Sequence, residues 1–82
     1  MRNMELQKKI LGILFRLEGV ALCESTLAAE AEIAIGHPLK LEEFEREIKT
    51  LTGEGFIVKS FDAFYEATYE ITPSGKKAIM GR

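Results

Sequence analysis

Four glutamates lie close together in the middle of the chain, at Glu42, Glu43, Glu45 and Glu47. Carboxylates at such short spacing could act as a general acid and base, or bind a hard metal ion. That chemistry needs a cleft that excludes water. The apolar residues of the same segment predict a helix, and its inner side takes Leu41, Phe44, Ile48 and Leu51. All four glutamates then fall on the convex outer side, where we expect them to stabilise the start of the helix rather than to catalyse or to bind a metal.

The single histidine and the single cysteine offer little further chemistry. His37 lies between Gly36 and Pro38, which predicts a solvated turn. Cys23 has neither a second cysteine nor a Cys and His cluster in the sequence, so no intrachain disulfide or zinc site is expected. We expect a half-buried structural thiol, with a redox sensor as the alternative. The chain also lacks a glycine-rich phosphate loop. We therefore predict no enzyme, no cofactor and no small-molecule ligand.

The spacing of apolar residues predicts three helices in the first two thirds of the chain. Residues 6–17 carry leucines and isoleucines three and four positions apart, the period of one helix face, and a short strand is expected at 20–22. Ser25 or Thr26 is the expected cap of a second helix, which Gly36 ends. The inner side of this second helix is predicted to carry Leu27, Ala28, Ala31 and Ile35. The third helix is the acidic one at 41–51, which Gly53 or Gly55 closes.

The last third of the chain predicts a hairpin and a short helix. Residues 56–71 contain β-rich segments in which apolar and polar residues alternate, as in a hairpin with one wet face. Thr72 is the expected cap of a final helix with Pro73 at its first position. This order of elements predicts an α+β fold, a small winged helix-turn-helix domain of three helices, a β-hairpin wing and a short C-terminal helix.

Length and hydropathy limit the organisation of the chain. Its 82 residues predict a single winged-helix domain over 1–82. The sequence contains no run of 18 apolar residues and no apolar stretch after its first residues that is typical of a signal peptide. A cytoplasmic protein without membrane contact is therefore expected.

Three segments resemble the PadR and MarR regulators: Gly36 to Leu51, Gly55-Phe56-Ile57, and Tyr69-Glu70-Ile71-Thr72-Pro73-Ser74-Gly75. The resemblance covers about residues 10 to 80. It implies that residues 41–52 form a recognition helix for the major groove, that the wing touches phosphates, and that the protein is a homodimer. Arg46 matches the PadR pattern, whereas Lys40 and Glu45 stand where such a helix has a Ser or Thr cap and an outward Tyr.

The distribution of charge disagrees with that implication. Residues 23–47 carry seven glutamates against Lys40 and Arg46, a net charge of −5, whereas contacts to phosphates depend on Lys and Arg. The wing has no cation between Lys59 and Glu66. Reading of bases by the acidic helix is therefore not expected. The candidate DNA-binding residues are Lys40, Arg46, Lys49, Lys59, Lys76 and Lys77.

Apolar residues outside the predicted core suggest a protein interface. The apolar arc of the first helix is wider than a single core needs, so residues 78–80 or a second copy of the chain should cover it. At the wing, Phe61 and Tyr65 are expected to fold back onto the sheet, and an exposed Phe64 would seek a partner. The candidate interface residues are Met4, Leu11, Phe15, Phe64, Tyr65, Ile79 and Met80.

Two functions remain open. The first is a transcription-regulator-like protein that associates with DNA as a homodimer, and the second is a protein–protein interaction module that does not bind DNA.

Overall fold

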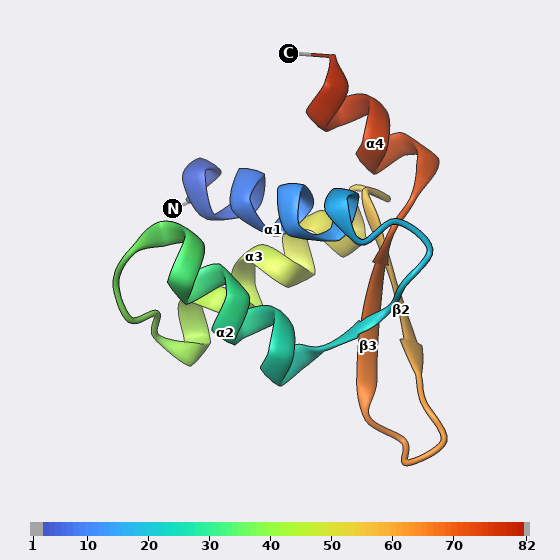
Figure 1. Ribbon diagram of the computed structural model, residues 1–82, viewed down its shortest axis with the longest axis horizontal. Coiled ribbons are helices and arrows are strands. Elements are labelled where there is room, and N and C mark those ends of the chain that lie inside the picture. The colour runs from blue at the N-terminus through green and yellow to red at the C-terminus, as the bar shows by residue number, and fades with distance from the viewer. Residues whose placement is uncertain (1–2, 82) are drawn as a thin grey trace.

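The computed structural model describes residues 3–81, which form four helices and one antiparallel sheet (Figure 1). In chain order the elements are α1 (Met4–Arg16), β1 (Leu22–Cys23), α2 (Glu24–Ile35), α3 (Leu41–Gly53), β2 (Ile57–Phe61), β3 (Ala67–Ile71) and α4 (Pro73–Met80). The three helices, the hairpin and the short last helix confirm the predicted winged-helix arrangement.

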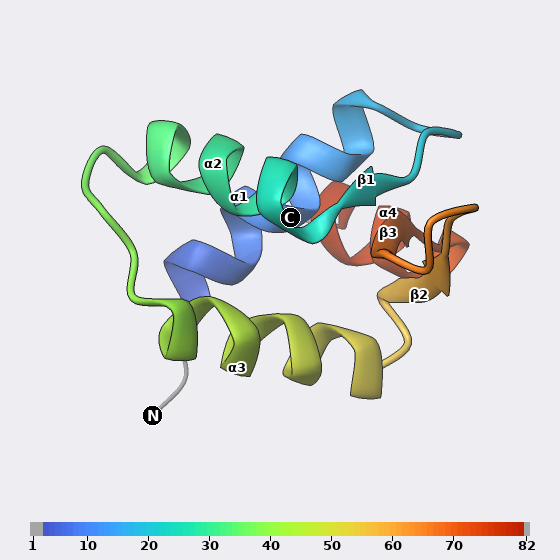
Figure 2. The same cartoon turned by 90° about the horizontal axis from the view of Figure 1, so that it is seen from below.

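Helix α1 is central to the packing and contacts α2, α3, α4 and β3. Figure 2 shows α2 along one side of the molecule and α3 along the other, with α1 between them. The helix begins after Asn3, whose side-chain oxygen accepts a hydrogen bond from the Leu6 N–H at 3.1 Å. Leu6, Ile10 and Leu14 are fully buried at the core as predicted, whereas Leu17, the predicted end of the apolar stripe, follows the helix and is exposed.

Helix α2 begins two residues earlier than the first of its predicted caps, Ser25, would allow. Cys23 occupies the cap position in an extended conformation, and Ser25 and Thr26 already belong to the first turn. The end was predicted correctly. Gly36 has a φ of 89°, and its N–H donates to the Glu32 carbonyl oxygen, a left-handed termination that glycine adopts without steric cost.

Helix α3 buries Phe44, Ile48 and Leu51 as predicted. Leu41 was predicted to point inward, but it is 64% exposed because it occupies the first helical position, ahead of the stretch that packs on the core. Position 47 is the second difference, since a glutamate there is buried. The inner side of α3 therefore consists of three apolar residues and one acid.

The sheet has three strands in the order β1-β3-β2, all antiparallel. Strand β1, which the sequence placed at 20–22, pairs Leu22 with Tyr69 and Cys23 with Thr68 in the middle of β3. Strands β2 and β3 pair from Ile57 with Ile71 to Phe61 with Ala67 and extend away from the helices (Figure 1). The hairpin is therefore fixed at its base and free at its tip.

Helix α4 returns the chain to α1. Thr72 caps it by accepting from the Gly75 N–H at 3.0 Å, and Pro73 takes the first position, both as predicted. Gly75 packs so closely that a methyl group there would overlap the Phe56 carbonyl oxygen. The half-buried Ile79 packs against the core beside Gly12 of α1. Residues of α4 thus cover part of the wide apolar side of α1, as expected.

Candidate nucleic-acid interface

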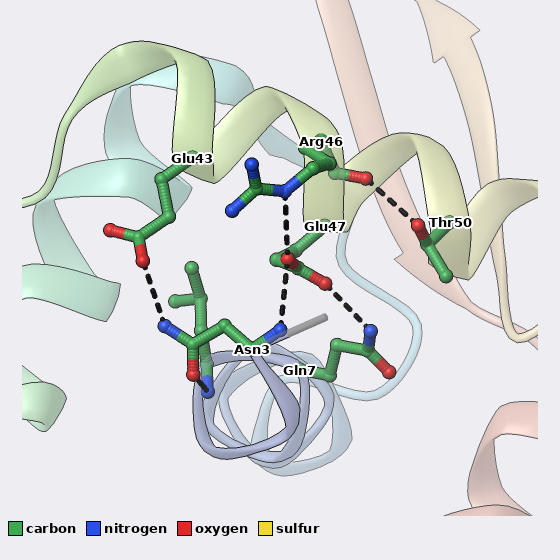
Figure 3. Close-up of polar contacts among 7 residues, drawn as sticks. Asn3, Gln7, Glu43, Arg46, Glu47 and Thr50 are labelled. Carbon is green, nitrogen blue, oxygen red and sulfur yellow. Dashed lines mark hydrogen bonds and ion pairs between the residues drawn. The ribbon is translucent and has the colours of Figure 1, made fainter. Parts of the chain in front are cut away.

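Glu47 lies on the inner side of α3 with an exposed fraction of 0%. Its Oε1 accepts a hydrogen bond from Gln7 Nε2 at 2.7 Å, and its Oε2 accepts one from the Asn3 backbone N–H at 3.1 Å. Arg46 Nε lies 3.4 Å from the same Oε2. Figure 3 shows these contacts joining α3 to the start of α1. The prediction that Glu47 points outward is wrong, because its side chain is buried between α3 and α1, where Gln7 and Asn3 donate hydrogen bonds to it.

The Glu47 carboxylate is stabilised in its charged form. Burial by itself would raise the pKa of Glu47, but the hydrogen bonds from Gln7, Asn3 and Arg46 outweigh it and bring the pKa below its ordinary value of 4.5. The neighbouring Glu43 is half-buried, and its Oε2 accepts from Asn3 Nδ2 at 3.0 Å. Two of the four glutamates are therefore engaged with α1.

The solvent side of α3 consequently carries fewer acids than the sequence suggested. Glu42 and Glu45 are exposed there, beside the exposed Arg46 and Lys49. Glu43 and Glu47 keep their negative charges, but Glu47 is buried and Glu43 is half-buried. The charge objection to phosphate contact counted four outward glutamates, and the structure removes one of them, Glu47, from the surface.

A sequence signal for Glu47 exists, but it is ambiguous. Position 47 lies three residues after Phe44 and four before Leu51, a spacing that shares one helix face. Glutamate is almost never fully buried without a partner, which favours an outward assignment. Its partners Gln7 and Asn3 lie 40 and 44 positions away in the chain. The local sequence therefore does not indicate that they meet.

Lys49 of α3 and Lys59 of β2 line one hollow between the helix and the wing, together with Glu24, Glu45 and Tyr69. The Tyr69 hydroxyl donates to Glu24 Oε1 at 3.1 Å. Burial raises the pKa of Tyr69 to about 12, helped by that hydrogen bond and by the two carboxylates, so the phenol is neutral at physiological pH. Two predicted DNA-binding lysines from different elements thus meet at one place.

A second hollow lies at the amino-terminal end of α3. Lys40 and Arg46 line it, together with Pro38, Glu42 and Glu43. Four of the six predicted cations therefore lie on or beside α3, three of them at 40, 46 and 49 and the fourth, Lys59, on the facing strand β2.

The remaining two cations belong to α4. Lys76 Nζ lies 2.6 Å from Glu18 Oε1, and Lys77 is exposed. Figure 1 shows α4 at the opposite end of the molecule from the wing tip. The structure does not bring Lys76 and Lys77 together with the other four.

The wing tip is aromatic and exposed. Phe64 and Tyr65 are 84% and 88% exposed, and Phe61 is exposed as well, so the expectation that Phe61 and Tyr65 fold back onto the sheet is wrong. Asp62 Oδ1 accepts from the Phe64 and Glu66 N–H groups and fixes the turn. Tyr65 takes the left-handed region with a φ of 62°. This turn directs both side chains away from the sheet.

The predicted interface residues of α1 and α4 differ in exposure. Met4 and Met80 are exposed, and Phe15 and Ile79 are half-buried, so these four remain open to a partner. Leu11 was predicted to face a partner, but the chain's own core buries it. A groove of about 330 Å³ runs along this side, and its lining includes Met4, Leu11, Phe56 and Ile79.

The remaining candidates for chemistry are one cysteine and one histidine. Cys23 is half-buried as predicted, and hydrogen bonds from Thr26 and then Ser25 lower the pKa of its thiol. His37 is exposed in its turn. Within residues 3–81, no group of three or more His, Cys, Asp or Glu side chains could hold a metal ion. In the same part of the chain, no helix has the length and hydropathy needed to cross a membrane.

Comparison with known proteins supports the fold through structure alone. No protein-family model matches the sequence, and no curated protein matches it either. Solved structures from several organisms are similar to it. RosR from H. salinarum has a TM-score of 0.79 at 23% identity over 93% of this chain. A MarR-family transcriptional regulator from Silicibacter pomeroyi has a TM-score of 0.76 at 18% identity over 93% of this chain. A Thermoplasma acidophilum protein has a TM-score of 0.77 at 21% identity over 96% of this chain.

These matches define the class of fold as that of the winged helix-turn-helix transcription regulators of the MarR and RosR kind. The chain is shorter than the proteins that it matches. It spans 66% of the RosR chain, 47% of the MarR-family regulator and 75% of the Thermoplasma acidophilum protein.

Proposed function

We propose that this protein associates with duplex DNA as a transcription regulator, with α3 in the major groove. The observation that carries this proposal is the burial of Glu47, which leaves Arg46 and Lys49 exposed on the solvent side of α3 with one acid fewer beside them. Lys40 and Lys59 extend the cationic positions at both ends of the helix. Similarity to MarR-family structures supports the same role. No catalytic role is proposed, and a regulator of this kind would act with the DNA in the cytoplasm.

The proposal includes a homodimer. Met4, Phe15, Ile79 and Met80 leave apolar area exposed or half-exposed along the α1–α4 side. This side is distinct from the solvent side of α3 (Figure 2), so pairing there would leave both α3 helices available. Two copies would also double the number of cations that face one duplex. Sedimentation at low micromolar concentration tests this point, and a 9.2 kDa monomer would reject the dimer.

Binding to random-sequence duplex DNA as a function of salt tests the main proposal. Each phosphate contact should contribute about 0.9 to the slope of log K against log salt. The double substitution Arg46→Ala with Lys49→Ala should reduce that slope. Lys77→Ala is the matched control, because it removes an exposed cation from α4, away from α3. Absence of duplex binding at about 50 mM salt, where such contacts are strong, would reject DNA association.

The wing tip favours a second candidate function, a protein–protein interaction module. Phe64 and Tyr65 form an exposed aromatic pair with no Lys or Arg between Lys59 and Glu66. Aromatic side chains of this kind commonly anchor protein interfaces. Phe64→Ala should then change the oligomeric mass or the capture of a partner while the fold persists. If mass and capture stay unchanged in Phe64→Ala and Phe15→Ala, this candidate fails.

A further inference from the structure

The contact between Arg46 and Glu47 uses one end of the guanidinium group. Arg46 Nε lies 3.4 Å from Glu47 Oε2, and the arginine side chain is 52% exposed. Figure 3 shows the two terminal nitrogen atoms of Arg46 pointing away from the carboxylate. These atoms carry four of the five N–H donors of an arginine side chain. The contact therefore orients the group and leaves its fork of donors available.

Glu47 provides a rigid support for that contact. Its side chain is fully buried, and Gln7 and Asn3 of the α1 region hold both of its oxygen atoms. A carboxylate fixed in this way cannot turn to follow a mobile arginine. The contact instead restricts the positions that Arg46 Nε takes. An arginine held before binding loses less conformational freedom when it meets a ligand.

We propose that Glu47 is a positioning residue that presents the Arg46 fork to the O6 and N7 atoms of a guanine in the major groove. A planar fork of donors matches these two acceptors, and no other base offers the same pair there. The buried carboxylate also offsets part of the arginine charge, so Arg46 contributes less to indiscriminate attraction by phosphates. This inference rests on the proposed DNA function and adds a specificity to it.

Two variants of equal charge separate the positioning role from a simple loss of negative charge. Glu47→Gln keeps the shape of the side chain but removes the anionic contact to Arg46. Glu43→Gln also removes one carboxylate from α3, at a side chain that bonds Asn3 and has no hydrogen bond or ion pair with Arg46. Urea denaturation of both variants shows whether they are folded under the binding conditions.

The probe is a set of duplexes that the wild-type protein selects from a random-sequence pool. We expect a guanine preference that Glu47→Gln reduces roughly 10-fold, as loss of one good base contact would. Binding of Glu47→Gln to unselected duplex should become tighter, because an acid is lost while Arg46 is released. A variant that is merely damaged would bind both duplexes more weakly. Glu43→Gln should tighten unselected binding and keep the guanine preference.

Nitrogen-detected NMR of the free protein measures the solvent exchange of the Arg46 Nε–H group and so tests the inference without DNA. The Arg46 Nε–H signal should exchange slowly with water in the wild type and in Glu43→Gln, and rapidly in Glu47→Gln. Equal exchange in all three proteins would overturn the inference. So would selected duplexes without guanine, or a guanine preference that survives Glu47→Gln, and both results would leave the DNA function standing. Absence of any duplex binding by the wild type would remove the DNA function and this inference together.

Discussion

The inner side of α3 buries a charged side chain, whereas the tip of the wing exposes aromatic ones. An acid, Glu47, is withdrawn from water in the first region, whereas Phe64 and Tyr65 stand in water in the second. Residue type alone predicts the reverse. Glu47 meets three donors at its two oxygen atoms, while the wing tip extends beyond every helix (Figure 1). Whether a side chain is buried therefore depends on the groups that the fold places next to it, and not on its residue type alone.

Glu47→Ala gives the largest expected effect on this comparison. The substitution leaves the buried Gln7 amide and the Asn3 N–H without their acceptor. Loss of these hydrogen bonds should lower the free energy of unfolding by about 3 kcal/mol, measured by urea denaturation. Glu45→Ala is the control, since it removes an exposed glutamate from the same helix, and it should change the value by less than about 0.5 kcal/mol. Equal effects of the two substitutions would contradict the assigned burial.

Acidification is expected to weaken the inner side of α3 selectively. The folded-state pKa of Glu47 is lowered below 4.5, so its contribution to stability is present above that pH and is lost as pH falls through the folded-state pKa. The free energy of unfolding of the wild type should approach that of Glu47→Gln as the pH drops below 4.5. Urea denaturation across this range gives the difference, in which the other carboxylates cancel. A constant difference would mean that Glu47 is not stabilised as a carboxylate.

Asn3→Ala should have an intermediate effect. Asn3 caps α1 through its Oδ1 and donates from Nδ2 to Glu43 Oε2. Loss of such a cap costs about 1 kcal/mol, while the backbone N–H that binds Glu47 stays in place. Asn3→Ser restores a capping oxygen without the donor to Glu43, so it should recover most of the stability. Thermal unfolding of the three proteins is sufficient, and an undiminished midpoint in Asn3→Ala would argue against the cap.

Phe64→Ala should have the smallest effect on folding. The side chain contributes little to the core because it is 84% exposed, so its removal should change the free energy of unfolding by less than about 0.5 kcal/mol. The same urea measurement decides. A loss comparable with that of Glu47→Ala would show that Phe64 packs within the fold, and the contrast between the two regions would then disappear.

The sequence predicted the fold better than it predicted the site. The three buried apolar residues of α3, the glycine end of α2 and the Thr72-Pro73 start of α4 are local patterns, and the structure confirms each of them. The prediction for the cap of α2 was wrong, because Ser25 and Thr26 lie inside the first turn and Cys23 takes the cap position without a side-chain hydrogen bond. A difference of this kind shifts an element by one or two residues without changing its type.

The candidate interface depended on contacts between distant segments. The sequence named Lys49 and Lys59 but could not place them on one hollow, because they come from a helix and from a strand. It also placed Leu11 at an interface, although Leu11 is buried in the core. The angular position of a residue on a helix does not say which neighbouring element covers it. The sequence grouped Lys76 and Lys77 with the other four cations by charge. Both lysines belong to α4, which lies at the end of the molecule opposite the wing tip.

Local patterns in the sequence are sufficient to predict the order and type of the elements, because helix periods, strand alternation, glycine ends and a proline start act over a few neighbouring residues. Tertiary structure decided which charges of α3 face the solvent. That outcome depends on Gln7 and Asn3, which are remote in the chain and reach Glu47 only when α1 packs against α3. A buried carboxylate is stable when donors replace the water that it loses, and packing alone brings those donors to it.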